Sequence, residues 1–242
     1  MKFDKVALRS RPALILMILI MLALLQGCAS LDDWPGVASG PDSDVRIEAG
    51  LREALEVGSQ RAVNRLGRID GYFADPNLRI PLPEAIEPAA TQLRRLGLAG
   101  QLDELELAMN RAAELAAAEA GDVFIQAIRG LRPSDARAIL NGGDDAATRF
   151  LRQTAGPTLT RRYQPIVANA LNQVQAYQQF RELAERWNRL PTGRPLDFNL
   201  EDYVTERALD GLFQALADEE QRIRRDPVAR TTALLREVFG GD

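Results

Sequence analysis

The spacing of the apolar residues restricts the fold most, because it is helical over almost the whole chain beyond residue 44. Strict alternation of apolar and polar residues, which indicates strands, is absent from the sequence, and so is an internal repeat. The longest periodic stretch, residues 199–226, carries one stripe of large apolar residues and a second of small ones, so we expect it to lie centrally. These stripes are Leu209, Leu212, Leu216 and Ile223, and Ala208, Gly211 and Ala215. We predict an all-α fold, a single compact domain of about eight helices.

Glycines and prolines predict where these helices end. The segment "GRIDGYFADPNLRIPLPE" separates a first helix from a short one that opens at Pro83 and has Gly97 as its C-terminal cap. Pro157 is expected to interrupt the later part, because proline lacks the N–H that a helix interior needs. The later helices are expected at 144–154, 158–174 and 176–190, with a last one from Pro227 to Phe239.

The N-terminus is typical of a secretory signal peptide. A basic start, "MKFDKVALRSRP", precedes thirteen apolar residues, Ala13 to Leu25. This run is shorter than the roughly 20 residues that span a bilayer as a helix. The following "LQGC" resembles the bacterial lipobox, in which the cysteine becomes the new N-terminus and carries lipid. We therefore predict a lipoprotein signal peptide over residues 1–27. An ordinary signal peptide with an unrelated cysteine, or a retained membrane anchor, is the alternative.

Cys28 is the only cysteine in the chain, so it cannot form an internal disulfide. Lipidation explains its position, and this covalent lipid is the one cofactor-like group that we predict. Residues 28–43 are rich in Gly, Pro, Ser and Asp and indicate a flexible tether, followed by the helical domain at 44–242. Ala29 follows the cysteine, which favours an outer-membrane lipoprotein whose domain faces the periplasm.

The residue types that are missing exclude most catalytic mechanisms. The chain has no histidine, its only lysines are Lys2 and Lys5, and beyond Ser43 its only serines are Ser59 and Ser134. Serine–histidine triads, cysteine–histidine dyads, lysine Schiff bases and histidine-ligated metals therefore lack their parts. Removing the predicted signal peptide takes away four basic residues and one acidic residue, which changes the net charge from −4 to −7. We expect no nucleic-acid partner.

The stretch "ILNGGDDAATRFL" invites a functional interpretation. Two glycines and two aspartates suggest a carboxylate metal site or the turn of nucleotide cyclases, but that turn joins strands and continues with Glu-Phe, where this chain has Asp145 and Ala146. The two carboxylates would repel a bound phosphate, and a calcium-binding loop has a different spacing of its acidic residues. We predict a structural turn: Asn141 ends a helix, a glycine adopts a positive φ and Asp144 caps the next helix.

Polar residues on the two flanking helices could meet if these helices pack together. One interpretation is a network of ion pairs that fixes the helix register. The other is a carboxylate site in a cleft, centred on Glu106, Asp144 and Asp145 and dependent on Mg²⁺ or Ca²⁺. The candidate residues are Glu106, Asn110, Asp144, Asp145, Arg149 and Arg152.

Four segments resemble an uncharacterised bacterial family, filed as domain of unknown function 4197. The similarity covers nearly all of residues 51–240 and includes the lipoprotein signal. It implies a secreted or lipid-anchored helical domain and carries over no catalytic residue and no ligand. The segments are "ELELAMNRAAE", "ILNGGDDAATRF", "YVTERALDGLF" and "ARTTALLREVFG".

Our first hypothesis is a non-enzymatic binding or scaffold module of the cell envelope, held to the membrane by its lipid. Its partner would be a protein or an apolar ligand, the latter in a cavity lined by residues such as Leu105, Met109, Phe150 and Leu212. The alternative is the carboxylate-based enzyme described above. A third idea, a role at peptidoglycan, has no recognition motif to support it.

Overall fold

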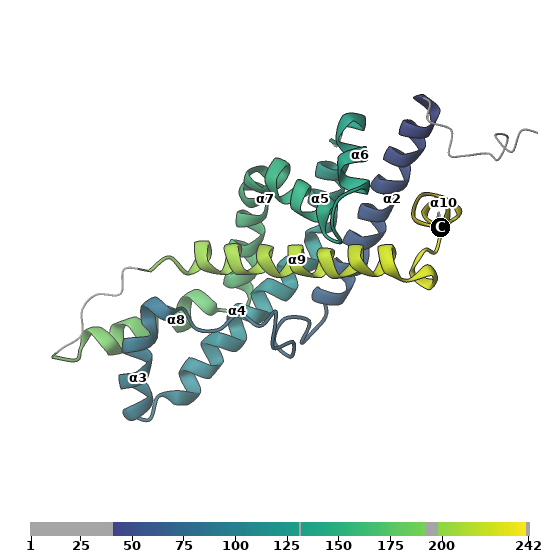
Figure 1. Cartoon of the computed structure of the whole chain (residues 1–242). Coiled ribbons are helices and arrows are strands. Elements are labelled where there is room, and N and C mark those ends of the chain that lie inside the picture. Colours follow the sequence, from purple (N-terminus) through teal and green to yellow (C-terminus); the bar gives the residue numbers. More distant parts are fainter. Residues whose placement is uncertain (1–40, 131, 192–197, 241–242) are drawn as a thin grey trace, which may run out of the picture. The chain divides into compact units, whose positions relative to one another are not determined.

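The computed structural model describes residues 41–130, 132–191 and 198–240 (Figure 1). The predicted signal peptide, Cys28 and most of the predicted tether lie outside these residues. Within them every regular element is helical, so the fold is all-α, as predicted, and no described helix is long and apolar enough to cross a membrane. The helices are α2 (Pro41–Leu66), α3 (Glu87–Arg95), α4 (Ala99–Glu119), α5 (Gly121–Arg129), α6 (Pro133–Leu140), α7 (Ala146–Gln173), α8 (Ala176–Asn188), α9 (Leu200–Arg225) and α10 (Ala233–Phe239), with 3-10 turns η2 (Glu84–Ile86) and η3 (Pro227–Ala229).

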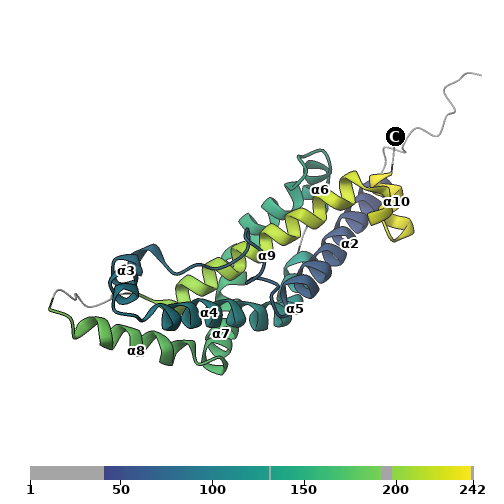
Figure 2. The ribbon, with the colours of Figure 1, turned by 90° about the horizontal axis from the view of Figure 1, so that it is seen from below.

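Helix α9 lies at the centre of the packing, as its two-sided pattern predicts. It packs against α7, α2 and α4, and Figure 2 shows it lying alongside α2. Both predicted stripes are buried, so large side chains such as Leu212 and Leu216 fill the core on one side. On the other side the small residues Ala208 and Ala215 let neighbouring segments come close to the helix backbone.

The clearest example of this close approach is Gly211. A Cβ atom at this position would lie 2.5 Å from Cε1 of Tyr72, so only glycine leaves room for the ring. Tyr72 is fully buried, and its hydroxyl donates a hydrogen bond to the carbonyl oxygen of Ala208 at 2.7 Å. The loop between α2 and α3, residues 67–83, is thereby anchored to α9.

Helix α7 corrects the expectation that Pro157 ends a helix. It runs without a break through Pro157 and Pro165. Each proline removes one backbone hydrogen bond and costs about 3 kcal/mol in a helix interior. The buried side chains of Leu159, Tyr163 and Val167 span this region, and burying each contributes roughly 1.5–3 kcal/mol. Tertiary packing on both sides of α7 therefore outweighs the local preference of proline.

Three helix ends test the sequence predictions more finely. Gly97 has a φ of 82° and caps α3, as predicted: its N–H donates to Arg94 and the N–H of Leu98 donates to Leu93. The first helix begins at Pro41, before the predicted domain start at residue 44, because proline fits the first turn of a helix. The last helix begins at Ala233, after the short turn η3, with Thr232 as its N-cap.

Candidate functional site

The predicted polar residues on α4 hold the loop 67–83 in place. Asn110 is completely buried; its side chain accepts the N–H of Ile80 at 2.9 Å and donates to the carbonyl oxygen of Ile80 at 2.8 Å. One turn earlier, Glu106 pairs with Arg79 of the same loop, with Oε1 and Nε 2.7 Å apart. Both contacts join α4 to this loop and not to α7, so among the described residues Glu106 and Asn110 do not form the ion-pair network that we expected between the two helices.

Glu114, which the sequence analysis overlooked, completes this row. It is buried, and its Oε1 accepts the backbone N–H groups of Tyr72 and Phe73, both at 3.2 Å. Its other oxygen lies 2.6 Å from Arg111, and the hydrogen bond to Glu114 is the main reason why the pKa of Arg111 is raised. The regular spacing of 106, 110 and 114 along one helix face was the available signal. Glu106, Asn110 and Glu114 are called the α4 clamp below.

The "GGDD" segment forms the corner between α6 and α7, and α9 holds it from outside. Glu220 is buried and accepts the N–H groups of Ala147 and Thr148, at 3.0 and 2.8 Å, and the Thr148 hydroxyl at 2.8 Å. Arg224 lies 2.9 Å from Glu220 and donates to the carbonyl oxygens of Ile139 and Leu140. Glu220 thus caps the start of α7, and Arg224 the end of α6. Glu220 and Arg224 are called the corner clamp.

Two details of the predicted turn are therefore wrong. Asp144 does not cap α7, because it forms an ion pair with Arg225, and Asp145, at the N-cap position, makes no side-chain capping bond. Within the described residues Gly97 is the only glycine with a positive φ, so neither glycine of the corner needs one. Gly142 is instead required for steric reasons, because a Cβ at this position would lie 2.5 Å from the Cβ of Ala146.

The candidate carboxylates do not come together in one site. Asp145 pairs with Arg149 one turn later, at 2.9 Å. Arg152 pairs with Asp210 of α9 at 2.6 Å. In the described part of the chain no hydrogen bond or ion pair links Glu106 to either aspartate, and no three acidic or cysteine side chains group to hold a metal ion.

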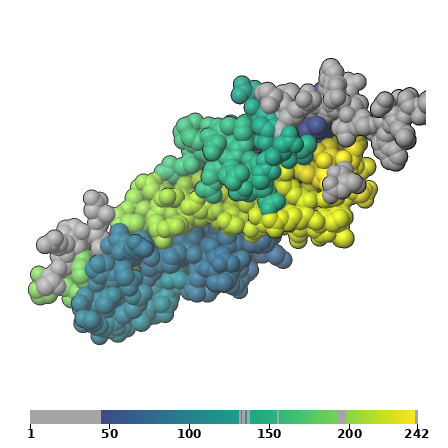
Figure 3. Space-filling model, viewed as in Figure 1, coloured from purple at the N-terminus to yellow at the C-terminus, as the bar shows by residue number. Residues whose placement is uncertain are grey.

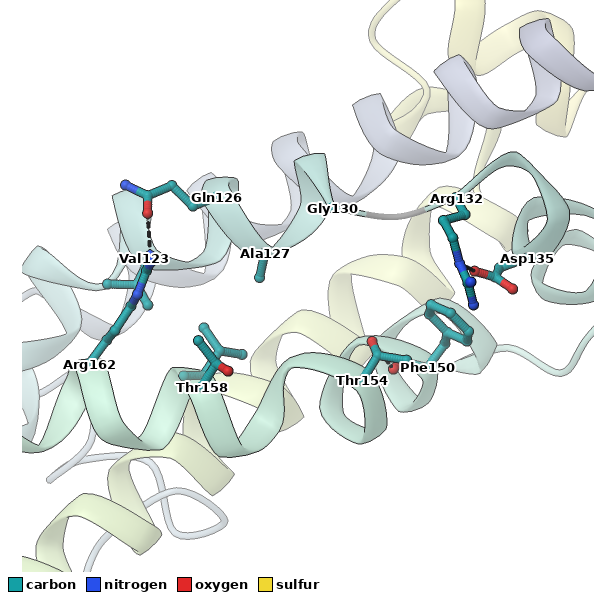
Figure 4. A pocket seen from close by; sticks show the side chains of 11 residues that line it. Val123, Gln126, Ala127, Gly130, Arg132, Asp135, Phe150, Thr154, Thr158 and Arg162 are labelled. Atoms are coloured by element: carbon teal, nitrogen blue, oxygen red, sulfur yellow. Dashed lines mark hydrogen bonds and ion pairs between the residues drawn. The ribbon is translucent and has the colours of Figure 1, made fainter.

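A cavity of about 430 Å³ lies between α5, the start of α6 and α7 (Figure 4). Phe150 lines it, whereas Leu105, Met109 and Leu212, which we expected beside Phe150, are buried in the core. We call this space the α5–α7 cavity. Its lining consists of Val123, Gln126, Ala127, Gly130, Arg132, Asp135, Phe150, Thr154, Thr158, Leu159 and Arg162.

Each end of the α5–α7 cavity has an arginine. At one end the guanidinium of Arg162 donates to the side chain of Gln126, and Figure 4 shows this bridge between α7 and α5. At the other end Arg132 lies 3.4 Å from Asp135. In the described residues Arg162 has no carboxylate partner, so the cavity has a surplus positive charge at that end. Between the two ends the walls combine apolar side chains, such as Val123 and Phe150, with the hydroxyl side chains of Thr154 and Thr158. Nothing in the sequence pattern pointed to Arg162.

Comparison with known proteins identifies the family. A family model described as "Protein of unknown function (DUF4197)" matches residues 42–240, so the chain belongs to this family. No curated protein and no solved structure matches the chain.

Proposed function

We propose that this protein is a lipid-anchored, non-enzymatic binding module of the bacterial cell envelope, with the α5–α7 cavity as its ligand site. The lipobox-like sequence at Cys28 supports the anchor, and Ala29 supports an outer-membrane location facing the periplasm. The composition of residues 28–40 supports a tether that would let the domain reach a ligand near the membrane surface.

The use of the buried carboxylates favours binding over catalysis. Glu114 and Glu220 each accept several hydrogen bonds from the backbone and pair with an arginine, so they are committed to the fold. A general acid or base needs a carboxylate that can reach a substrate. The histidines, lysines and cysteines that other mechanisms use are missing from the sequence beyond Cys28.

The observation that carries the proposal is the guanidinium of Arg162, which has no carboxylate partner among the described residues and lies at the end of a cavity with partly apolar walls. Ligand sites in proteins typically have volumes of about 300–1,000 Å³, with apolar walls and a few polar groups that orient the ligand. The cavity of about 430 Å³ lies within this range of volumes, and its lining combines apolar and polar side chains. Its chemistry suits a small molecule with an anionic head near Arg162 and an apolar body along Val123, Phe150 and Leu159.

The anchor is tested first on the full-length chain in a Gram-negative host. Intact mass spectrometry of the membrane fraction should show wild-type protein that begins at residue 28 and carries the mass of acyl chains. Cys28→Ser should carry none. Wild-type protein that keeps residues 1–27, or lacks lipid, contradicts the anchor while leaving the cavity untouched.

The cavity is tested on the lipidated protein with octanoate as the anionic probe and 1-octanol as its neutral counterpart. Native mass spectrometry should detect an octanoate adduct that Arg162→Ala loses. Arg95→Ala, an exposed arginine of α3 without an ion pair in the described residues, should keep the adduct. Octanoate binding that is absent from wild type, or equal in both variants, contradicts the ligand site.

A further inference from the structure

A second hollow follows the other side of α7, where it packs against α9. Its volume is about 450 Å³. Figure 3 shows the α5–α7 part of the chain lying directly against α9 on one face of the molecule. We call this hollow the α7–α9 trough; it is lined by Arg152, Gly156, Thr160 and Gln164 of α7 and by Asp202, Thr205, Glu206, Leu209, Asp210 and Phe213 of α9.

Side chains close the trough at both ends. At one end Arg152 of α7 pairs with Asp210 of α9 at 2.6 Å. At the other end Gln164 donates to Asp202 at 3.0 Å. Asp202 and Asp210 are eight residues apart on one helix, which corresponds to about 12 Å at 1.5 Å per residue. The trough can therefore hold a short molecule lying along the helices.

The space between these two bridges is open. On the α7 side it is bordered by Gly156, and a Cβ atom built there meets nothing within 4 Å. On the α9 side stands Glu206, which is exposed and has no hydrogen bond or ion pair among the described residues. Three carboxylates face one guanidinium in the trough, so its surplus charge is negative. This is the opposite of the α5–α7 cavity.

Thr205 supplies an independent sign of a missing partner. It is only 2% exposed, it lines the trough, and its hydroxyl has no hydrogen-bond partner among the described residues. A buried hydroxyl without a partner costs about 1–3 kcal/mol, so such groups are rare unless something else satisfies them. Leu209 flanks this position with apolar surface, and the guanidinium of Arg152 lies over the Phe213 ring, 4.4 Å from its centroid.

We propose that the α7–α9 trough binds a small organic cation, an ammonium group on a short apolar stem. The ammonium would lie between Glu206 and the neighbouring aspartates and donate to their oxygens and to the Thr205 hydroxyl. The stem would lie along Leu209, next to Phe213. A metal ion is disfavoured at this place, because the described residues provide no group of three ligating side chains. This site is separate from the α5–α7 cavity.

The test uses cadaverine, a diamine with a five-carbon stem, and full-length lipidated protein in nanodiscs of neutral lipid. Isothermal titration calorimetry should show saturable binding of cadaverine. The neutral 1,5-pentanediol should give no such binding, and empty nanodiscs give the background. Glu206→Gln should weaken binding at least about tenfold, which corresponds to ~1.4 kcal/mol. Thr205→Val, which keeps the shape and removes the hydroxyl, should cause a smaller loss.

Two further variants keep the outcome clear. Gly156→Leu places a side chain in the open part of the trough and should abolish binding while the folding transition stays intact. Arg162→Ala, in the other cavity, should bind cadaverine like wild type, so that failure of one site is distinguishable from failure of the other. Absence of saturable cadaverine binding to wild type, or equal binding by wild type, Glu206→Gln and Gly156→Leu, overturns the proposal.

Discussion

The two clamps contain the same kinds of charged side chain as the two hollows beside α7, but these side chains have opposite roles in the two kinds of region. In the corner clamp Glu220 is buried and accepts three hydrogen bonds besides its pair with Arg224. In the α7–α9 trough Glu206 is exposed and has no partner among the described residues. A carboxylate whose hydrogen bonds all go to the protein holds the fold together, and one without partners is free to meet a ligand. Local partners, and not residue type, separate the two regions.

The corner clamp should give the largest effect on stability. Glu220→Ala leaves the mostly buried Arg224 without its carboxylate partner and takes the cap from α7. Removing one member of a buried pair typically costs about 3–5 kcal/mol, so the free energy of unfolding in urea should fall by that amount. Glu206→Ala is the matched control on the same helix and should change stability by no more than about 0.5 kcal/mol. A similar loss of unfolding free energy in both variants would contradict the distinction between a carboxylate that stabilises the fold and one that is free to bind a ligand.

The α4 clamp should come next. Asn110→Ala leaves the N–H and the carbonyl of Ile80 buried without partners, and each such group costs about 1–3 kcal/mol. We expect a loss of roughly 2–4 kcal/mol in thermal or urea unfolding. Glu106→Gln alters a partly exposed ion pair with Arg79, which is worth about 0–1 kcal/mol. A loss of function by Glu106→Gln at unchanged stability would restore the carboxylate-enzyme hypothesis.

These clamps also show how far the sequence could lead. Periodicity predicted the all-α fold, the central position of α9 and the cap at Gly97, because these features follow from local spacing and backbone preference. It also selected Glu106 and Asn110, which lie on one face of α4. It missed Glu220 as the cap of α7. The residues that Glu220 caps, Ala147 and Thr148, precede it in the sequence by 73 and 72 positions, and local spacing does not reveal such a contact.

The errors have the same origin. Local rules predicted a break at Pro157 and a cap at Asp144, and distant packing overrode both. The hollows were beyond prediction for a different reason. Nothing in the sequence distinguishes Arg162 and Glu206 from other charged residues on a helix surface. Only the packing of α7 against α5 and α9 places them beside the α5–α7 cavity and the α7–α9 trough.

Two glycines in helix interiors extend the comparison to the backbone. Gly211→Ala pushes a Cβ to within 2.5 Å of the Tyr72 ring, and such overpacking costs about 1–3 kcal/mol, partly offset by the better helix propensity of alanine. Gly156→Ala meets no atom within 4 Å outside its chain neighbours, but the following Pro157 disfavours a helical conformation at a residue with a Cβ, which offsets the better helix propensity of alanine, so the free energy of unfolding should change by less than about 0.5 kcal/mol. Thermal unfolding should therefore shift clearly only for Gly211→Ala. A fall in Tm for both would mean that the region around Gly156 is as tightly packed as the core.

A gain at neutral pH, and a distinct effect at high pH, is expected from removing the hydroxyl of Tyr163. This hydroxyl is buried without a hydrogen-bond partner among the described residues, and burial raises its pKa above the usual 10.0. The folded state therefore favours the neutral phenol, and this contribution to stability is complete below pH 10.0 and is lost as the pH rises above it. Tyr163→Phe removes this unpartnered hydroxyl, so it should raise the free energy of unfolding at pH 7 by about 1 kcal/mol and make the alkaline loss less steep.

Tyr72 is the matched control, because burial raises the pKa of its hydroxyl as well but that hydroxyl donates to Ala208. Tyr72→Phe should lose about 1 kcal/mol at pH 7, since the Ala208 carbonyl oxygen loses its hydrogen bond from Tyr72. Urea unfolding of both variants at pH 7 and above pH 10 separates the two contributions. If Tyr163→Phe loses as much stability at neutral pH as Tyr72→Phe, the Tyr163 hydroxyl has a hydrogen-bond partner in solution. In that case the unpaired hydroxyl of Thr205 is no longer evidence for an absent ligand.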